Sequence, residues 1–149
     1  MARRKVPAMS DQASYSLQGG CLCGAVRFEL TAPPTSSGYC HCTRCQRRTG
    51  TGSSISAFID PDSLHWLQGE DLIKGWLPAS DGAEKCFCNR CGAHLFSRSR
   101  DGSRVGIRMG AFDSDPGVRP STRQYVAYAP SWEQIPDDGL PRYEESRPR

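Results

Sequence analysis

Residues 21–30 read CLCGAVRFEL, two cysteines followed by a strand pattern. Val26, Phe28 and Leu30 alternate with small or charged neighbours, and this period of two predicts a half-buried β-strand. Side chains two residues apart on a strand point to the same side, so the thiols of Cys21 and Cys23 can face one point. The stretch therefore predicts β-structure built beside a cluster of sulfur atoms.

Cysteines form two further clusters, at residues 40–45 (CHCTRC) and 86–91 (CFCNRC). A zinc–thiolate bond of about 2.3 Å puts the sulfurs of one site about 3.8 Å apart, and C-x-C and C-x-x-C spacings reach such a centre with little strain. Disulfide frameworks are typical of short secreted chains, whereas a chain of 149 residues can bury a core of its own. We therefore interpret the clusters as metal ligands, with zinc as the metal.

Spacing alone leaves two partitions of the eight cysteines open. The pairs 21/23 and 88/91 could close one four-thiolate structural site. Cys40, Cys42 and Cys45 would then be three ligands beside a free fourth position, which is the pattern of a catalytic zinc. Alternatively, two closed sites of four cysteines each would use every thiol, and both would be structural.

The formal net charge is +3, from 19 basic and 16 acidic residues. Seven thiolates and two Zn²⁺ would change this to 3 − 7 + 4 = 0, so the charge does not favour nucleic acid and we predict no such partner. Residues 1–10 lack the apolar core of a signal peptide, and we find no run of about 18 apolar residues that could span a membrane. We therefore expect no membrane association and a cytoplasmic location, where thiols stay reduced and available to metal.

Residues 15–143 are predicted to form a single domain that is mainly β. Short apolar and aromatic runs separated by turn residues lie at 54–59, 64–67, 72–77, 87, 95–96, 105–109 and 125–128. Their spacing of roughly ten residues predicts short antiparallel strands in a sandwich or barrel-like sheet. Helix is expected only over 43–49, capped by Thr43 and stopped by Gly50. Residues 1–14 are expected to be a disordered tail, and 144–149 a C-terminal tail.

Several motifs resemble those of the glutathione-dependent formaldehyde-activating enzyme (GFA) family, including its centromere-protein-V-like zinc domains. They are residues 20–28 (GCLCGAVRF), 40–45, 87–92 (FCNRCG) and 110–116 (GAFDSDP), followed by Trp132 and the Leu140-Pro141 pair. The resemblance implies a β-tent of short antiparallel strands around two zinc sites. By position, it makes Cys21, Cys23, Cys88 and Cys91 the ligands of a structural zinc. It likewise makes Cys40, Cys42 and Cys45 the ligands of a reactive zinc.

The resemblance also implies a reaction: addition of a small thiol such as glutathione to an aldehyde, with carbon–sulfur cleavage of the S-hydroxymethyl adduct as its reverse. Three thiolates leave Zn²⁺ with a net charge of about −1 and make it a weak Lewis acid. Such a site suits holding a sulfur ligand better than generating hydroxide. We therefore predict a zinc-dependent carbon–sulfur lyase or thiol–aldehyde adduct enzyme. The alternatives are a non-catalytic zinc-binding structural or interaction module, or a thiol redox sensor.

Three arginines of the short helix, Arg44, Arg47 and Arg48, are candidates for binding the carboxylates of glutathione, because guanidinium groups recognise carboxylates well. The alternative is a solvated helix face. His41 lies between two ligands on a strand and should face away from the metal, either supporting the ligands by hydrogen bonding or packing in the interior.

Three further residues are candidates for a role at the metal sites: Cys86, His94 and Asp113. Cys86 matches no ligand of the family, and we expect a small buried hydrophobe, with an extra ligand or a redox-active thiol as alternatives. His94 is expected to be a strand residue rather than a ligand. Asp113 would either orient a polar group near the site or form a turn.

Overall fold

The computed structural model describes residues 14–148. Over this range the protein is mainly β, as predicted, with eleven strands in two sheets and a single α-helix. The tail expected over 1–14 lies outside the described residues, apart from Ser14. Among the described residues, no helix is long and apolar enough to cross a membrane.

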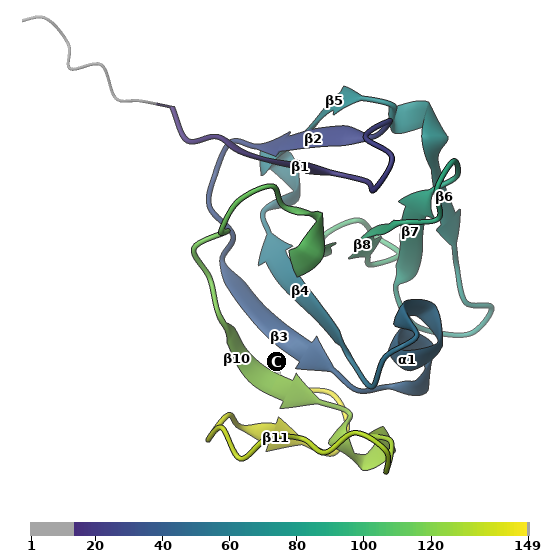
Figure 1. The fold of residues 1–149 in the computed structure, drawn as a ribbon, viewed down its shortest axis with the longest axis vertical. Helices are drawn as coiled ribbons and strands as arrows, with labels where there is room; N and C mark the ends of the chain where they lie inside the picture. The colour runs from purple at the N-terminus through teal and green to yellow at the C-terminus, as the bar shows by residue number, and fades with distance from the viewer. Residues whose placement is uncertain (1–13, 149) are drawn as a thin grey trace, which may run out of the picture.

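The small sheet is antiparallel, with the strand order β1-β2-β5. Its strands are β1 (Leu17–Gly20), β2 (Arg27–Leu30) and β5 (Leu64–Gln68). The large sheet has the order β11-β10-β3-β4-β9-β8-β7-β6. Its strands are β3 (Ser36–Cys40), β4 (Ser54–Ile59), β6 (Ile73–Trp76), β7 (Glu84–Cys88), β8 (His94–Arg98), β9 (Val105–Arg108), β10 (Pro120–Gln124) and β11 (Arg142–Tyr143). Figure 1 shows the small sheet at the top of the molecule and the β10–β11 edge at the bottom.

Strands lie at most of the predicted positions, and two differences have physical reasons. The run at 125–128 is not a strand: β10 ends at Gln124, Tyr125 turns the chain with a φ of 58°, and Val126–Tyr128 form a 3₁₀ helix, η4. A left-handed residue leaves the extended conformation, so the aromatic run cannot continue the sheet. In addition, β10 pairs with β3 and with β11 in parallel, because long connections allow a parallel return.

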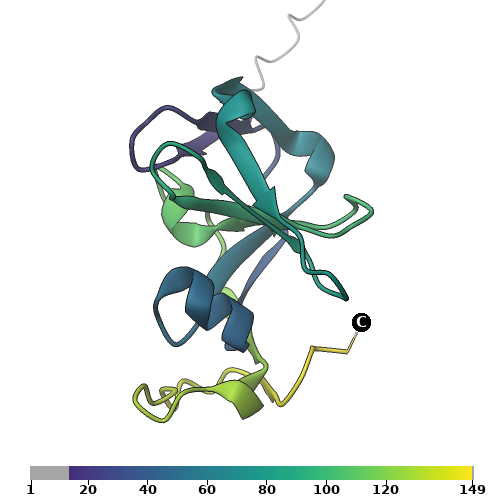
Figure 2. The ribbon, with the colours of Figure 1, turned by 90° about the vertical axis from the view of Figure 1, so that its right-hand side faces the viewer.

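The helix α1 (Thr43–Thr49) lies where it was predicted. Gly50 ends the helix with a φ of 71°, and its N–H donates a hydrogen bond to the Gln46 carbonyl at 2.8 Å. The N-cap is Cys42 rather than Thr43, because the Cys42 sulfur accepts the N–H of Cys45 at 3.4 Å. In Figure 2, α1 lies between the upper strands and the β10–β11 edge.

The C-terminal segment hydrogen-bonds to the turn that follows β10. The N–H of Tyr125 donates to the Glu145 carbonyl at 3.0 Å, and the N–H of Arg147 donates to the Gln124 side chain at 2.8 Å. Residues 144–147, expected to be a tail, therefore contact the domain over this stretch.

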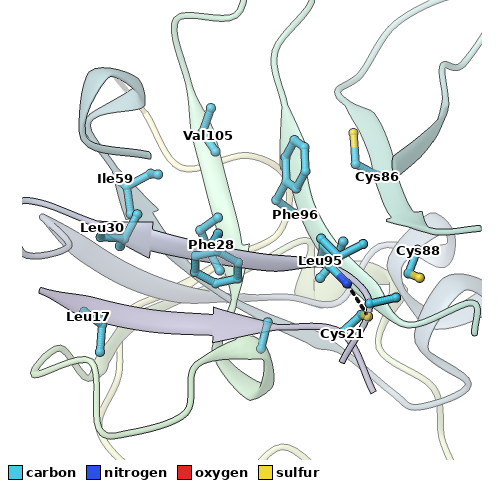
Figure 3. Close-up of a cluster of buried hydrophobic side chains, with 14 residues drawn as sticks. Leu17, Cys21, Phe28, Leu30, Ile59, Cys86, Cys88, Leu95, Phe96 and Val105 are labelled. Atoms are coloured by element: carbon cyan, nitrogen blue, oxygen red, sulfur yellow. Dashed lines mark hydrogen bonds between the residues drawn. The ribbon is translucent and has the colours of Figure 1, made fainter. Parts of the chain in front are cut away.

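The core fills the space between the two sheets. Phe28, Leu30, Leu95 and Ile107 are fully buried, and burial of each contributes about 1.5–3 kcal/mol. Figure 3 shows that this cluster continues to the sulfur atom of Cys21 and to further cysteines on β7. Cys21 and Cys88 are thus part of the apolar core.

Candidate metal centres

Four cysteines from two hairpins form the first sulfur group. The ligand atoms of Cys21, Cys23, Cys88 and Cys91 all lie within 4.8 Å of one another. Cys21 and Cys23 belong to the β1–β2 connection, whereas Cys88 ends β7 and Cys91 lies in the turn before β8. The sulfurs of Cys21 and Cys23 are 3.6 Å apart, close to the separation expected around one zinc.

Main-chain N–H groups point at these sulfurs. Val26 donates to the Cys21 sulfur at 3.2 Å, and main-chain hydrogen bonds, chiefly from Ala93, lower the pKa of Cys91 to about 6. Gly92 follows Cys91 with a φ of 73°, a conformation that costs glycine little and lets the turn close. Because N–H donors favour the thiolate over the thiol, the group fits a zinc ion that requires deprotonated sulfur.

Three cysteines around the start of α1 form the second group. The ligand atoms of Cys40, Cys42 and Cys45 lie within 4.8 Å of one another. Cys40 ends β3, Cys42 caps the helix, and Cys45 is buried in its first turn. Hydrogen bonds from Cys40 and then Cys42 hold the pKa of the Cys45 thiol well below its usual range. This group also fits zinc, and three sulfurs leave the fourth position of a tetrahedral ion for another molecule.

The structure thus gathers seven cysteines into two groups, and Cys86 belongs to neither. Its side chain is 1% exposed in the core, on the same strand as Cys88, and burial raises its pKa to about 11. A buried thiol that stays protonated at neutral pH reacts poorly with oxidants. These properties fit the expected small buried hydrophobe and weigh against a redox sensor built on Cys86.

His41 faces a buried polar cluster behind the second sulfur group. Its Nε2 is 3.4 Å from Nη1 of Arg123, whose side chain is 5% exposed. Arg123 donates to the Asp138 carboxylate at 2.6 and 3.2 Å and places its Cζ 3.9 Å above the ring of Tyr39. The ring of Tyr39 links Arg123 of β10 to β3, the strand that ends in Cys40, whereas the ion pair links β10 to the segment before β11. Sequence reasoning missed Arg123 and Asp138, because the parallel pairing of β10 with β3 brings Arg123 here and the return of the chain to β11 beside β10 brings Asp138.

The three helix arginines have different surroundings. Arg48 lies against the sheet and donates to main-chain carbonyls of β7 and β8 at 2.6 and 3.1 Å. Arg44 pairs with Asp81 at 2.9 Å, and Arg47 is exposed. Arg48 is therefore built into the fold, whereas the other two lie closer to solvent.

The remaining candidates lie apart from the sulfur groups. Asp113 forms an ion pair with Arg27, with Nη1 and Oδ1 3.0 Å apart, and so joins the 110–116 segment to β2. His94 begins β8 and is half-buried. Neither belongs to a cluster of potential metal ligands within the described part of the chain.

Comparison with known proteins shows which protein family this chain resembles. The sequence profile described as glutathione-dependent formaldehyde-activating enzyme matches residues 16–128. A candidate glutathione-dependent formaldehyde-activating enzyme of Halomonas elongata is 34% identical over 128 residues, 80% of this chain and 80% of that protein. An uncharacterized lyase of Schizosaccharomyces pombe is 29% identical over 79 residues, 53% of this chain and 55% of that protein. A crystal structure of a Rhodobacter sphaeroides protein shares the fold, with a TM-score of 0.56 at 22% identity, covering 85% of this chain and 98% of that one.

Proposed function

This chain belongs to the glutathione-dependent formaldehyde-activating enzyme family, and we propose that it is a zinc-dependent enzyme that forms and cleaves adducts between a small thiol and formaldehyde. The observation that carries the proposal is the separation of the cysteines into two groups. Four sulfurs beside the core can fill all four positions of a structural zinc site. Three sulfurs at the helix start leave the fourth position of a zinc ion open.

The proposed reaction balances without a redox partner. In one direction the thiolate sulfur adds to the carbonyl carbon of formaldehyde, a carbon–sulfur bond forms, and the oxygen takes a proton to give the S-hydroxymethyl thiol. In the other direction the hydroxyl group loses that proton, the carbonyl re-forms and the thiolate leaves, which is a carbon–sulfur lyase reaction. Zinc held by three thiolates would supply a position for a soft sulfur ligand and keep it deprotonated near neutral pH.

The chain's own residues prepare the site for this chemistry. Cys45 is fixed by the first turn of α1, and Cys42 is fixed as its cap, so the helix sets the spacing of two of the three sulfurs. Cys40 is fixed by β3, which pairs with β4 and β10 and whose Tyr39 ring contacts Arg123 of β10. Because the ligands are already held in place before the substrate arrives, few side chains need to be ordered on binding, and this favours turnover.

The proposal is tested by exchange measurements between ¹³C-formaldehyde and glutathione. We expect the zinc-loaded protein to speed interconversion with S-hydroxymethylglutathione by about tenfold or more over buffer. The Cys42→Ser variant should lose this effect, and the Cys86→Ala variant should keep it as a control for cysteine removal. Exchange at the spontaneous rate with fully zinc-loaded wild type would refute the enzyme and favour a non-catalytic zinc module.

A further inference from the structure

The turn after β10 holds Tyr125 in an unusual backbone conformation. Within residues 14–148, Tyr125 is the only residue other than glycine with a positive φ, at 58°. This left-handed conformation is unfavourable for a residue with a side chain, so it persists only where surrounding contacts impose it. The N–H of Tyr125 donates to the Glu145 carbonyl at 3.0 Å, and the Tyr125 carbonyl accepts the N–H of Tyr128 at 3.1 Å. The C-terminal segment and η4 therefore fix the turn.

The turn brings Tyr125 to a cavity of about 1140 Å³. On an extended strand, residues two apart face the same side of the sheet, so a continued β10 would place Tyr125 on the side of Arg123. Instead, Tyr125 lines the same cavity as Thr122 and Gln124, the residues that alternate with Arg123 on β10. Ser146 of the C-terminal segment lines this cavity as well. The left-handed turn thus places the tyrosine at the cavity rather than on the Arg123 side.

The side of the sheet that bears this cavity also bears Cys40, the first cysteine of the three-sulfur group (Cys40, Cys42 and Cys45). Gln124 is the strand partner of Cys40, and paired residues of neighbouring strands face the same side of a sheet. A Cβ added at Gly38, two residues before Cys40, would lie 2.9 Å from the Thr122 hydroxyl, which agrees with this assignment. Tyr125 therefore follows directly after the strand partner of one proposed zinc ligand.

Hydrogen bonds hold the Tyr125 turn against the segment that carries the three sulfurs. The N–H of His41 donates to the Gln124 carbonyl at 2.9 Å. The side-chain amide of Gln46 on α1 donates to the carbonyls of His41 at 2.6 Å and Tyr128 at 2.7 Å. The turn, the end of β3 and the start of α1 therefore form one connected unit, and Tyr125 keeps its position relative to the sulfurs.

The electrostatics of Tyr125 agree with this placement. Burial, and then the charge of Cys40, raises the pKa of the Tyr125 phenol above its usual value. The charge of Cys42 acts in the same direction, whereas a hydrogen bond from Ser146 opposes the rise. A phenol in these surroundings keeps its proton at neutral pH, so it can donate a hydrogen bond to a molecule in the cavity.

We propose that Tyr125 is a catalytic residue, whose hydroxyl donates a hydrogen bond to the aldehyde oxygen while the thiol sulfur adds to the carbonyl carbon. This inference rests on the proposed function and adds a residue to its mechanism. As the carbon–sulfur bond forms, the electron pair of the carbonyl moves to the oxygen, which becomes negative and takes a proton from water. In the reverse direction the hydroxyl group returns that proton to water, the carbonyl re-forms and the thiolate leaves. A donor placed where negative charge develops stabilises the transition state more than the reactants.

Tyr128 supplies a matched control in the same turn. Its ring centroid lies 6.2 Å from that of Tyr125, but its hydroxyl donates to the Glu145 carboxylate at 2.9 Å. Tyr128 is also absent from the lining of the cavity within residues 14–148. Replacing either tyrosine by phenylalanine removes one oxygen atom and keeps the ring, so both variants should fold like wild type.

The first test measures binding and needs no turnover. It compares S-methoxymethylglutathione, which has an ether oxygen in the place of the adduct hydroxyl, with S-propylglutathione, which has a methylene group there. Both thioethers would be titrated by calorimetry into the full zinc-loaded chain. We expect the ratio of their affinities to fall about fivefold in Tyr125→Phe relative to wild type, because the ether oxygen loses its hydrogen-bond donor. Tyr128→Phe should leave the ratio unchanged.

The second test is the ¹³C-formaldehyde exchange rate at equal zinc content. Tyr125→Phe should lose most of the catalysed rate, and Tyr128→Phe should stay near wild type. If wild type is active, an unchanged ratio or an unchanged rate in Tyr125→Phe overturns the role of Tyr125 and leaves the proposed function standing. If wild type exchanges only at the spontaneous rate, the proposed function fails; a lower ratio in Tyr125→Phe then still supports the oxygen contact, and an unchanged ratio overturns it. Absence of binding of either thioether to wild type refutes both, because the adduct is itself a thioether.

Discussion

Replacing Cys88 by serine should abolish folding, whereas replacing Cys42 by serine should leave the fold intact. Cys88 is fully buried at the end of β7 and belongs to the apolar core as well as to the four-sulfur group. Cys42 is half-buried at the helix start and belongs to the three-sulfur group alone. The two substitutions are chemically identical, so their comparison separates a structural from a reactive site.

The expected difference follows from the loops that each group closes. The four-sulfur group joins residues 21 and 91 and closes about 70 residues, whereas the three-sulfur group closes about six, so the loop-closure terms differ by (3/2)RT ln(70/6), about 2 kcal/mol. Zinc at a structural thiolate site contributes on the order of 10 kcal/mol to folding near neutral pH. That is comparable with the whole stability of a domain, about 5–15 kcal/mol. Loss of the four-sulfur site should therefore leave no stable folded state.

Both variants and wild type would be purified without chelator and compared by zinc content, solubility and thermal unfolding. We expect Cys88→Ser to be insoluble or unfolded. Cys42→Ser should be soluble, should hold about one zinc fewer per chain, and should melt within a few degrees of wild type. A soluble Cys88→Ser protein with full zinc content would refute the reasoning. Collapse of Cys42→Ser would instead assign the helix-start group to a structural site.

Three other predictions test the surroundings of the sites. Cys86→Ala should retain both zincs and lose about 1 kcal/mol of unfolding free energy in urea, and loss of one zinc would make Cys86 a ligand. Arg123→Met should lose about 2 kcal/mol because it removes buried charged hydrogen bonds, whereas Arg119→Met at the surface should change the urea midpoint little. Gly69→Ala should destabilise the protein more than Gly102→Ala. Both glycines have a similar positive φ, 70° and 74°. An added Cβ at residue 69 would lie 2.1 Å from a main-chain oxygen, whereas one at residue 102 would have no atom within 4 Å. If both variants lost the same unfolding free energy, the loss would come from backbone conformation alone and not from the close contact at residue 69.

Local patterns were sufficient to predict most of the secondary structure. The period-two run predicted β2, and the polar stretch ending in Gly50 predicted α1 with its correct end. The mainly β class followed from the short apolar runs. The spacing of the cysteines, by contrast, allowed two partitions, and family resemblance was needed to choose the one that matches the two sulfur groups.

Features that depend on strand register could not be read from the sequence. Arg108 and Ser56 meet only because β4 and β9 pair with these residues opposite each other. The Arg123–Asp138 pair depends on the chain returning to place β11 in parallel beside β10. No short-range pattern marks an arginine as buried, since most arginines are exposed. The buried positions of Arg108 and Arg123 therefore emerged from the structure alone.

The four-sulfur group also sets an order for the synthesis of this protein. Its two ligand pairs lie in separate hairpins, so the group cannot assemble before both hairpins have been made. Cys23 precedes Cys88 by about 65 residues, which corresponds to about 3–13 s of translation at 5–20 residues per second. During that interval the N-terminal thiols exist without their partners, and oxidants or other thiophilic metals compete for them. With zinc as the proposed ligand of this group, the supply of zinc during synthesis would set how much of the nascent protein reaches the native fold.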